Sequence, residues 1–200
     1  MNCKPVFVDV DDDLNINPDL IELAITKKTK AIMPVHWTGR ICNMDKILKI
    51  AKKHNLFVIE DSAQSMGASL KDRHAGTFGK ISAFSTHPLK NLNGLGDGGF
   101  VTTNNKKLYE KIKLYRNHGM KGRDNVEIIG VNSRLDSLHA EVLSFRLKKL
   151  KAIILKRQKN VNLYRKLIKT KKVNIINDKK IENNAYVMFI TLCKKRNELQ

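Results

Sequence analysis

The sequence predicts an α/β fold, with a mainly parallel sheet and helices on both of its faces. One observation is that short apolar runs alternate with amphipathic stretches through the first part of the chain. Another is that Asp61 ends one apolar run, while Lys90 lies in a glycine-rich loop after a second run. Ligands of such sheets usually bind beyond the carboxyl ends of the strands. The pattern therefore predicts a binding site that contains both side chains.

The elements expected in the first part of the chain alternate between strands and helices. In order they are a strand at residues 6–10, a short helix opened by Asn17 and Pro18, a strand at 30–36, a helix from Asn43 to His54 and a strand at 56–60. Asn43 is a favourable N-cap residue, and proline suits the first turn of a helix. Apolar residues recur at helical spacing in the second helix, whereas the run LFVIE is typical of a buried strand.

The later elements are expected to be two more strands followed by mostly helical sequence. In order they are a strand at 81–85, a strand at 99–103, a helix at 105–118, a long helical stretch at 133–169 in one piece or two, a polar loop or edge at 171–184 and a strand at 185–192. The last residues have the pattern of a helix that is just beginning, and the first strand lies inside a β/α series. We therefore expect the fold to be incomplete at both ends.

The strong positive charge does not by itself indicate a nucleic-acid-binding protein. The net charge is +19, but the basic residues are spread along the chain, without a zinc-ligand spacing or an RNA-binding motif. We interpret them as lysines on solvated helix faces, where they would also attract an anionic substrate. A nucleic-acid-binding module, which would bind with a steep salt dependence, is supported by charge alone.

Cysteine usage and hydropathy indicate a cytoplasmic protein. Cys3, Cys42 and Cys193 are an odd number and lie far apart, which favours free thiols in a reducing compartment. None lies near a histidine at a ligand-like spacing, so no metal site is expected. No apolar run approaches the roughly 20 residues of a membrane helix, and the first residues do not have the pattern of a signal peptide.

The pairing of Asp61 with Lys90 favours one kind of cofactor chemistry. An amine and a carboxylate at two neighbouring strand ends suit an enzyme that binds pyridoxal phosphate, where lysine forms a Schiff base and aspartate pairs with the pyridinium nitrogen. Desolvation and a nearby cationic ring would favour the neutral amine that this reaction needs. The alternative is that Lys90 is one surface lysine among many.

Several runs resemble the DegT/DnrJ/EryC1/StrS family of fold-type I sugar aminotransferases. They are PVFVDVD, KAIMPVHWTGR, MDKILKIAKKHNLFVIEDSAQSMGA, FSTHPLKNLNGLGDGGFVTTN, RNHG and GVNSRLDSLHAEVL. They occur in the order and spacing of the family and cover about residues 5–150. The resemblance implies the large domain of fold-type I pyridoxal phosphate-dependent transferases, partial over 1–132, then a helical connector at 133–170 and the beginning of a small domain at 171–200.

The resemblance also implies roles for six residues. Lys90 would form the Schiff base and shuttle the proton, Asp61 would contact the ring nitrogen, Gln64 the ring and its hydroxyl, and Ser85 the phosphate. His36 would lie near the cofactor edge, and Asn132 would reach the phosphate of the neighbouring subunit's cofactor, which requires a homodimer with composite active sites. Each position has a structural alternative: capping for Asp61, Gln64 and Asn132, backbone satisfaction for Ser85, and a hydrogen-bonded core position for His36.

The implied activity is amino transfer from an amino acid, expected to be glutamate, to a nucleotide-linked keto-deoxysugar, in surface polysaccharide or amino-sugar biosynthesis. A dehydratase remains an alternative, although lysine rather than histidine at position 90 favours transamination. An inactive truncated remnant is a further alternative. The family's phosphate-binding helix N-terminus precedes the matched region, so this chain alone is expected to bind the cofactor weakly or not at all.

Overall fold

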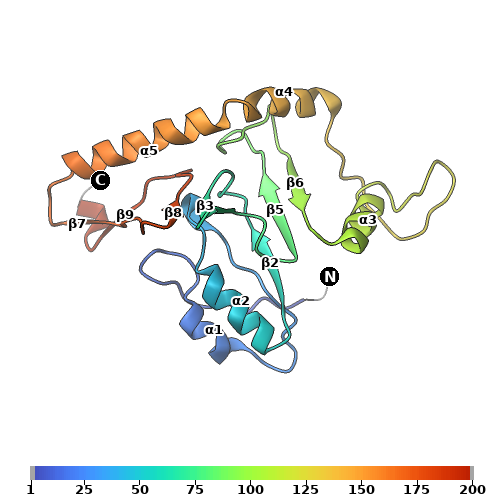
Figure 1. Ribbon diagram of the computed structural model, residues 1–200, viewed down its shortest axis with the longest axis horizontal. Helices are drawn as coiled ribbons and strands as arrows, with labels where there is room; N and C mark the ends of the chain where they lie inside the picture. Colours follow the sequence, from blue (N-terminus) through green and yellow to red (C-terminus); the bar gives the residue numbers. More distant parts are fainter. Residues whose placement is uncertain (1–2, 199–200) are drawn as a thin grey trace.

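A four-stranded sheet lies at the centre of the structure (Figure 1), a computed structural model that describes residues 3–198. Its strands, in the order β1-β2-β5-β6, are β1 (Ala31–Ile32), β2 (Phe57–Asp61), β5 (Ile81–Ser85) and β6 (Gly99–Thr102). The first three are parallel, and β6 runs antiparallel to β5. The expected mainly parallel sheet is confirmed. Val35 forms one more parallel bridge, with Asp61, at the carboxyl edge.

The two faces of the sheet differ in burial because side chains alternate along each strand. Buried side chains on one face are Ile32, Val58, Glu60, Ser82 and Phe84. Exposed side chains on the other face are Met33, Val35, Phe57, Ala83 and Val101. The alternation places Asp61 and Ser85 on this open face, since Asp61 pairs with Ala83 and Ser85 lies two residues further along β5.

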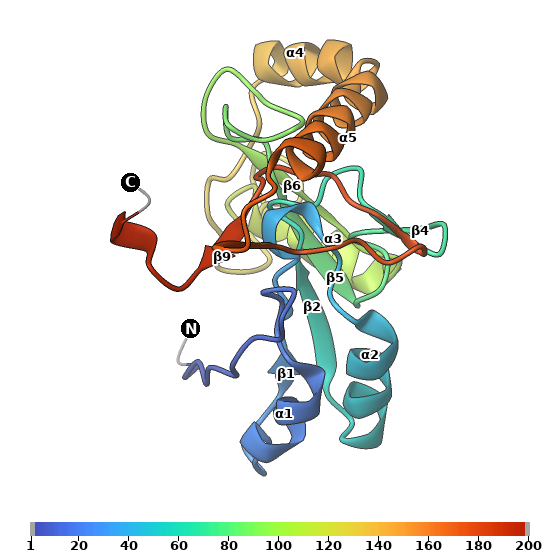
Figure 2. The same cartoon turned by 90° about the vertical axis from the view of Figure 1, so that its left-hand side faces the viewer.

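Four of the five helices in the described residues cover the buried face and the carboxyl edge of the sheet: α1 (Pro18–Ala24), α2 (Met44–Lys53), α4 (Ser137–Leu147) and α5 (Leu150–Leu167). The other helix, α3 (Lys106–Tyr115), follows β6 and has no buried residue. Ile21 of α1 and Ile47 of α2 belong to the same core cluster as Val58 of β2. Leu143 of α4 and Ile154 of α5 form a second cluster, which lies against the loop between β5 and β6. Figure 2 shows α1 and α2 beside β1 and β2, with α4 and α5 at the opposite end.

The predicted N-caps form as expected. The side chain of Asn43 accepts a hydrogen bond from Lys46 N, and that of Asn17 accepts one from Asp19 N. Each cap satisfies a backbone N–H that has no partner within the helix. The long helical stretch is two helices, α4 and α5, which was one of the two forms expected.

Loss of the Asn43 cap gives a first testable prediction. We expect Asn43→Ala to lower the free energy of unfolding by about 1 kcal/mol, because the first turn of α2 loses its side-chain acceptor. Urea denaturation followed by circular dichroism measures the change. Lys49→Ala, on the exposed surface of the same helix, is the matched control. Equal midpoints for the two variants would show that the cap contributes nothing.

The C-terminal part of the chain returns to the N-terminal part through a second sheet. This sheet has the order β4-β3-β8, formed by β3 (Ser69–Leu70), β4 (Arg73–His74) and β8 (Glu182–Asn183). A separate pair consists of β7 (Val173–Ile175) and β9 (Thr191–Cys193). Figure 1 shows β7, β8 and β9 beneath α5. The end of the chain therefore packs beside the turns that follow β1 and β2.

Two expected strands are wrong or displaced. Residues 6–10 do not form a strand. Val10 makes one isolated bridge with Ile16, and Val6 and Phe7 are exposed, because no neighbouring strand is available to pair with them. The strand expected at 185–192 is reduced to β9, which begins only at Thr191. The expected final helix is the short 3-10 turn Arg196–Glu198, with the last two residues outside the described part.

No helix in residues 3–198 has both the length and the apolar character needed to cross a bilayer.

Candidate functional site

Asp61 and Ser85 mark the carboxyl ends of two neighbouring parallel strands. Both are partly buried and lie on the open face of the sheet. Asp61 Oδ1 accepts a hydrogen bond of 3.0 Å from Ala63 N, so the carboxylate also caps its own turn. Ser85 Oγ accepts one of 3.2 Å from His87 N. The second carboxylate oxygen of Asp61 and the hydroxyl hydrogen of Ser85 therefore make no hydrogen bond to the described residues.

Lys90 lies in the loop that leaves β5 directly after Ser85 and enters β6 at Gly99. Thr86 closes this loop at its base, because its N–H donates to Gly98 O at 2.8 Å and its carbonyl accepts from Gly94 N at 2.7 Å. Lys90 N donates to His87 O at 2.9 Å within the loop. Lys90 therefore belongs to the same edge of the sheet as Asp61 and Ser85. Its Nζ forms no ion pair with any of the described residues.

Gln64 follows the end of β2 and contacts the turn after β1. Its Oε1 accepts a hydrogen bond of 2.8 Å from Thr38 N, whereas its amide NH₂ group donates to none of the described residues. The turn is the 3-10 segment Trp37–Gly39. Gly39 has φ +97°, and a Cβ there would lie 2.7 Å from Tyr186 N, so the close approach requires glycine. Gln64 thus holds a turn at the same edge of the sheet.

The structure does not bring His36 to the open face. The alternation along the chain turns its ring toward the buried face, where Nε2 lies 2.9 Å from Glu60 Oε2 and neither side chain is exposed. His36 Nδ1 accepts a hydrogen bond of 3.3 Å from Cys42 N, so Nε2 carries the proton that is donated to Glu60. This is the hydrogen-bonded core histidine that the sequence left open as the alternative. We therefore assign His36 a structural role rather than a contact with the cofactor.

Asn132 lies outside this edge, on the segment between α3 and α4. It pairs with Asn117, and its Oδ1 accepts a hydrogen bond of 3.1 Å from Arg134 Nε. Figure 1 shows this segment extending away from the sheet. Its apolar residues are open to solvent, with Ile129 95% exposed and Val126 65% exposed. The segment is ordered by its own backbone hydrogen bonds, such as that from His118 N to Val131 O.

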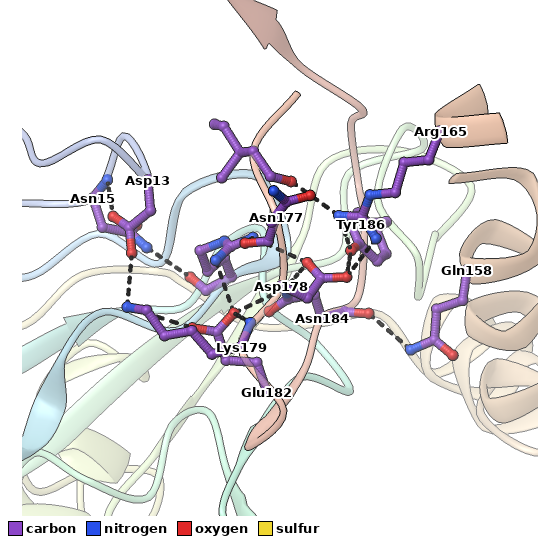
Figure 3. Close-up of polar contacts among 12 residues, drawn as sticks. Asp13, Asn15, Gln158, Arg165, Asn177, Asp178, Lys179, Glu182, Asn184 and Tyr186 are labelled. Atoms are coloured by element: carbon purple, nitrogen blue, oxygen red, sulfur yellow. Dashed lines mark hydrogen bonds and ion pairs between the residues drawn. The ribbon is translucent and has the colours of Figure 1, made fainter. Parts of the chain in front are cut away.

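A cluster of charged residues anchors the C-terminal part of the chain next to the Gly39 turn (Figure 3). We call it the Asp178 cluster; its members are Arg40, Arg165, Asp178, Glu182 and Tyr186. Arg40 donates to Glu182 Oε2 at 2.8 Å and to Asp178 Oδ1 at 3.0 Å. Arg165 donates to Asp178 Oδ2 at 2.8 Å, and the Tyr186 hydroxyl donates to the same oxygen.

Hydrogen bonding within the cluster shifts the pKa of its acid. Burial opposes ionisation of Asp178, but hydrogen bonds from Arg165, Tyr186 and Asn184 outweigh it and hold the pKa of Asp178 below its usual value. Burial and the bond to Asp178 raise the pKa of Tyr186. The cluster is therefore a set of paired charges at neutral pH.

The described part of the chain has no cluster suited to a metal ion, and its buried cysteine is unreactive. No group of three or more histidine, cysteine, aspartate or glutamate side chains there could hold a metal ion. Cys42 is fully buried, and burial raises the pKa of its thiol far above the usual range, so it is not a nucleophile. These findings leave the edge formed by Asp61, Ser85 and Lys90 as the candidate site.

Sequence reasoning missed one residue at this edge. Asn91 follows Lys90 directly, is 2% exposed, and donates from Nδ2 to Ala185 O at 2.7 Å. Its partner is a backbone carbonyl 94 residues further along the chain. Because any residue type can supply that carbonyl, no pattern in the sequence indicates the contact.

Comparisons with known proteins find a matching family and relatives over most of the chain. The model of the DegT/DnrJ/EryC1/StrS aminotransferase family matches residues 1–200. A pleiotropic regulatory protein of Geobacillus stearothermophilus is 39% identical over 98% of this chain and 54% of its own length. The UDP-N-acetyl-3-dehydro-α-D-glucosamine 3-aminotransferase of Acidithiobacillus ferrooxidans is 45% identical over 72% of this chain and 39% of its own length. The chain spans about half the length of the curated relatives it matches.

Solved structures show the same fold. DesV of S. venezuelae, crystallised in complex with a ketimine intermediate, superimposes with a TM-score of 0.93 at 34% identity, over 98% of this chain and 53% of its own. Helicobacter pylori PseC, an aminotransferase of pseudoaminic acid biosynthesis, gives a TM-score of 0.91 at 29% identity, over 96% of this chain and 53% of its own. The α/β fold expected from the sequence is therefore confirmed.

Proposed function

Since the chain belongs to the DegT/DnrJ/EryC1/StrS aminotransferase family, we propose that it forms part of a pyridoxal phosphate-dependent sugar aminotransferase. Its amino donor is an amino acid, with glutamate the expected one, and its acceptor is the keto group of a nucleotide-linked deoxysugar. The observation that supports this most is the shared sheet edge of Asp61, Ser85 and Lys90.

The residues at this edge fit the cofactor. Asp61 keeps one carboxylate oxygen that accepts no hydrogen bond from the described residues, which suits the N–H of a pyridinium ring. Ser85 has a hydroxyl hydrogen free for a phosphate oxygen. Lys90 has an amine outside any ion pair with the described residues. The donor set therefore matches the acid, hydroxyl and amine that this cofactor requires.

Each residue has a distinct task in amino transfer. Pyridoxal phosphate, when bound, supplies a ring that takes up the electron pair left on the donor carbon. Asp61 would hold the proton on the ring nitrogen, and Ser85 would orient the phosphate. Lys90 Nζ would hold the cofactor through its amine and, as a general acid and base, would take up and return the proton that amino transfer moves. Gln64 would orient the ring hydroxyl with its free amide group.

The substrate class is supported by the names of the relatives and by charge. Relatives at 41% identity are named dTDP-3-amino-3,4,6-trideoxy-α-D-glucose transaminase and UDP-2-acetamido-2-deoxy-3-oxo-D-glucuronate aminotransferase. A net charge of +19 would attract a diphosphate-linked sugar. We place the protein in the cytoplasm, in keeping with its three free cysteines.

A second copy of the chain would complete the site. The segment that carries Asn132 is ordered, and it exposes Ile129 and Val126 to solvent. Apolar side chains on an ordered extension are typical of a protein interface. We therefore propose a homodimer in which Asn132 reaches the cofactor phosphate of the partner subunit. The division into residues 1–132, 133–170 and 171–200 stays part of the proposal.

The test is chemical trapping of Lys90. The chain is incubated with millimolar pyridoxal phosphate, so that weak binding suffices, and is then reduced with borohydride and mapped by peptide mass spectrometry. Lys90 is expected to carry more label than any other lysine, because Asp61 and Ser85 hold the cofactor beside it.

Two arginine variants control this experiment. Lys90→Arg should abolish the selective label, whereas Lys71→Arg should leave it intact, since Lys71 is an exposed lysine paired with Asp45. Label spread evenly over the surface lysines, or no label at position 90, would contradict the proposal.

A further inference from the structure

The bond between Asn91 and Ala185 links the Lys90 loop to a distant segment. Both residues are buried, with Ala185 fully inaccessible. Asn91 Oδ1 accepts no hydrogen bond from the described residues, so the bond from Nδ2 to Ala185 O is the polar contact that the side chain makes there. The other hydrogen bonds that order the loop are local, at its base and around His87.

The segment that receives this bond is fixed from two other directions. Ala185 N donates to Gly39 O at 2.9 Å, and Val187 N donates to Thr38 O at 3.0 Å. From α5, Arg157 Nη1 donates to Tyr186 O and Val187 O, each at 3.0 Å. We refer to residues 184–187 as the anchor segment. It is held by the Gly39 turn, by α5 and by Asn91.

The anchor segment is also stiffened by charged and amide side chains (Figure 3). Gln158 Nε2 donates to Asn184 O at 3.0 Å, and Asn184 Nδ2 donates to Asp178 Oδ1 at 2.7 Å. Tyr186 belongs to the Asp178 cluster through its hydroxyl. The carbonyl of Ala185 on this segment is therefore held in place for the hydrogen bond from Asn91.

We propose that Asn91 is a positioning residue for Lys90. By bonding to the anchor segment it fixes the backbone of the loop at the residue next to the lysine, and so sets where Nζ lies relative to Asp61 and Ser85. The same segment holds Thr38, which in turn bonds to Gln64. The anchor segment thus aligns two parts of the site that are far apart in the sequence. This inference rests on the proposed function of Lys90.

The first experiment compares two asparagines of the same loop. Asn91→Ala is expected to lower the rate of borohydride-trapped labelling at Lys90 by roughly ten- to a hundredfold, because the reacting amine loses its placement. Asn93→Ala is the matched control, since its Nδ2 bonds to Pro88 O within the loop and is exposed. Hydrogen exchange should rise in both the loop and the anchor segment in Asn91→Ala, and in neither region in Asn93→Ala.

The second experiment loosens the anchor segment without touching the loop. Arg157→Gln removes the two hydrogen bonds that Arg157 donates to the anchor segment and should also lower labelling at Lys90, whereas Lys156→Gln, exposed on the same helix, should not. If Asn91→Ala fails to fold, the comparison of Arg157→Gln with Lys156→Gln tests whether the anchor segment positions Lys90.

The outcomes separate this inference from the proposed function. Absence of selective label at Lys90 in the unaltered chain contradicts the proposed function itself. Normal labelling there, unchanged in both Asn91→Ala and Arg157→Gln, overturns only the positioning role. The positioning role is also overturned if hydrogen exchange in the anchor segment becomes faster in either variant while labelling at Lys90 stays the same.

Discussion

Replacement of Glu60 with glutamine is expected to lower the free energy of unfolding by about 2–6 kcal/mol, because it leaves two buried N–H groups without an acceptor, at about 1–3 kcal/mol each. Glu60 is fully buried beneath the sheet, and its carboxylate accepts four hydrogen bonds. Oε1 accepts from Phe78 N at 2.7 Å and Gly79 N at 2.5 Å. Oε2 accepts from His36 Nε2 at 2.9 Å and Gly76 N at 2.8 Å.

Glutamine cannot replace this acceptor, because one of its two terminal groups is itself a donor. Whichever way the amide turns, its NH₂ faces two N–H groups and leaves them unsatisfied in the core. Urea denaturation measures the loss. Glu141→Gln, on the exposed surface of α4, is the matched control and should change stability by less than about 0.5 kcal/mol. Similar urea midpoints for Glu60→Gln and Glu141→Gln would show that the hydrogen bonds of the buried carboxylate do not stabilise the fold.

The cost of Glu60→Gln should depend on pH. Burial alone would raise the pKa of Glu60, but hydrogen bonds from His36 and from the backbone of Gly79 and Gly76 outweigh it, and the pKa lies below its usual value. A carboxyl with a lowered pKa in the folded state stabilises the protein fully above its unfolded pKa of about 4.3. That stabilisation is lost as the pH falls through the lower, folded value. The difference between the unaltered chain and Glu60→Gln should therefore narrow below about pH 4.

Much of the site could be predicted because strand ends leave a clear signal in the sequence. The apolar run before Asp61 and the run that ends at Ser85 predict two strands, and parallel neighbours bring their carboxyl ends together. The caps of α1 and α2 were predictable for a similar reason, since each depends on a few adjacent residues. Features of this kind can be predicted because they depend on residues that are adjacent in the sequence.

Features that depend on a distant partner could not be predicted in the same way. The residues expected to form a strand at 6–10 are suitable for one, but a strand needs a neighbouring strand to pair with. Among the described residues, Val10 forms one isolated bridge, with Ile16. The family resemblance implied that His36 lies near the cofactor edge. Its orientation is set by Glu60, a residue whose face is decided by alternation within β2. The contact of Asn91 depends on a backbone carbonyl, which carries no sequence signal at all.

Removal of Arg40 is expected to destabilise the C-terminal part of the fold by about 3–5 kcal/mol, because it leaves a buried carboxylate without its cation. The side chains of Arg40 and Glu182 are 6% and 4% exposed. In Arg40→Met the aliphatic volume is kept, but the cation nearest to Glu182 is then Lys179, with Nζ 3.8 Å from the carboxylate. Denaturation midpoints measure the loss of global stability in Arg40→Met. Hydrogen exchange at residues 176–187 shows whether the C-terminal part of the fold is the region that is destabilised.

Burial decides the size of this effect, and a second ion pair tests that argument. Lys46 forms a pair with Asp19 at 2.9 Å, but the two side chains are 52% and 71% exposed. Water screens such a pair, so Lys46→Met should cost no more than about 1 kcal/mol. Glu182→Gln added to Arg40→Met should recover part of the loss, since it removes the unpaired charge. If the two methionine variants cost the same, or if the double variant is less stable than Arg40→Met, burial of the charge is not what makes Arg40 important.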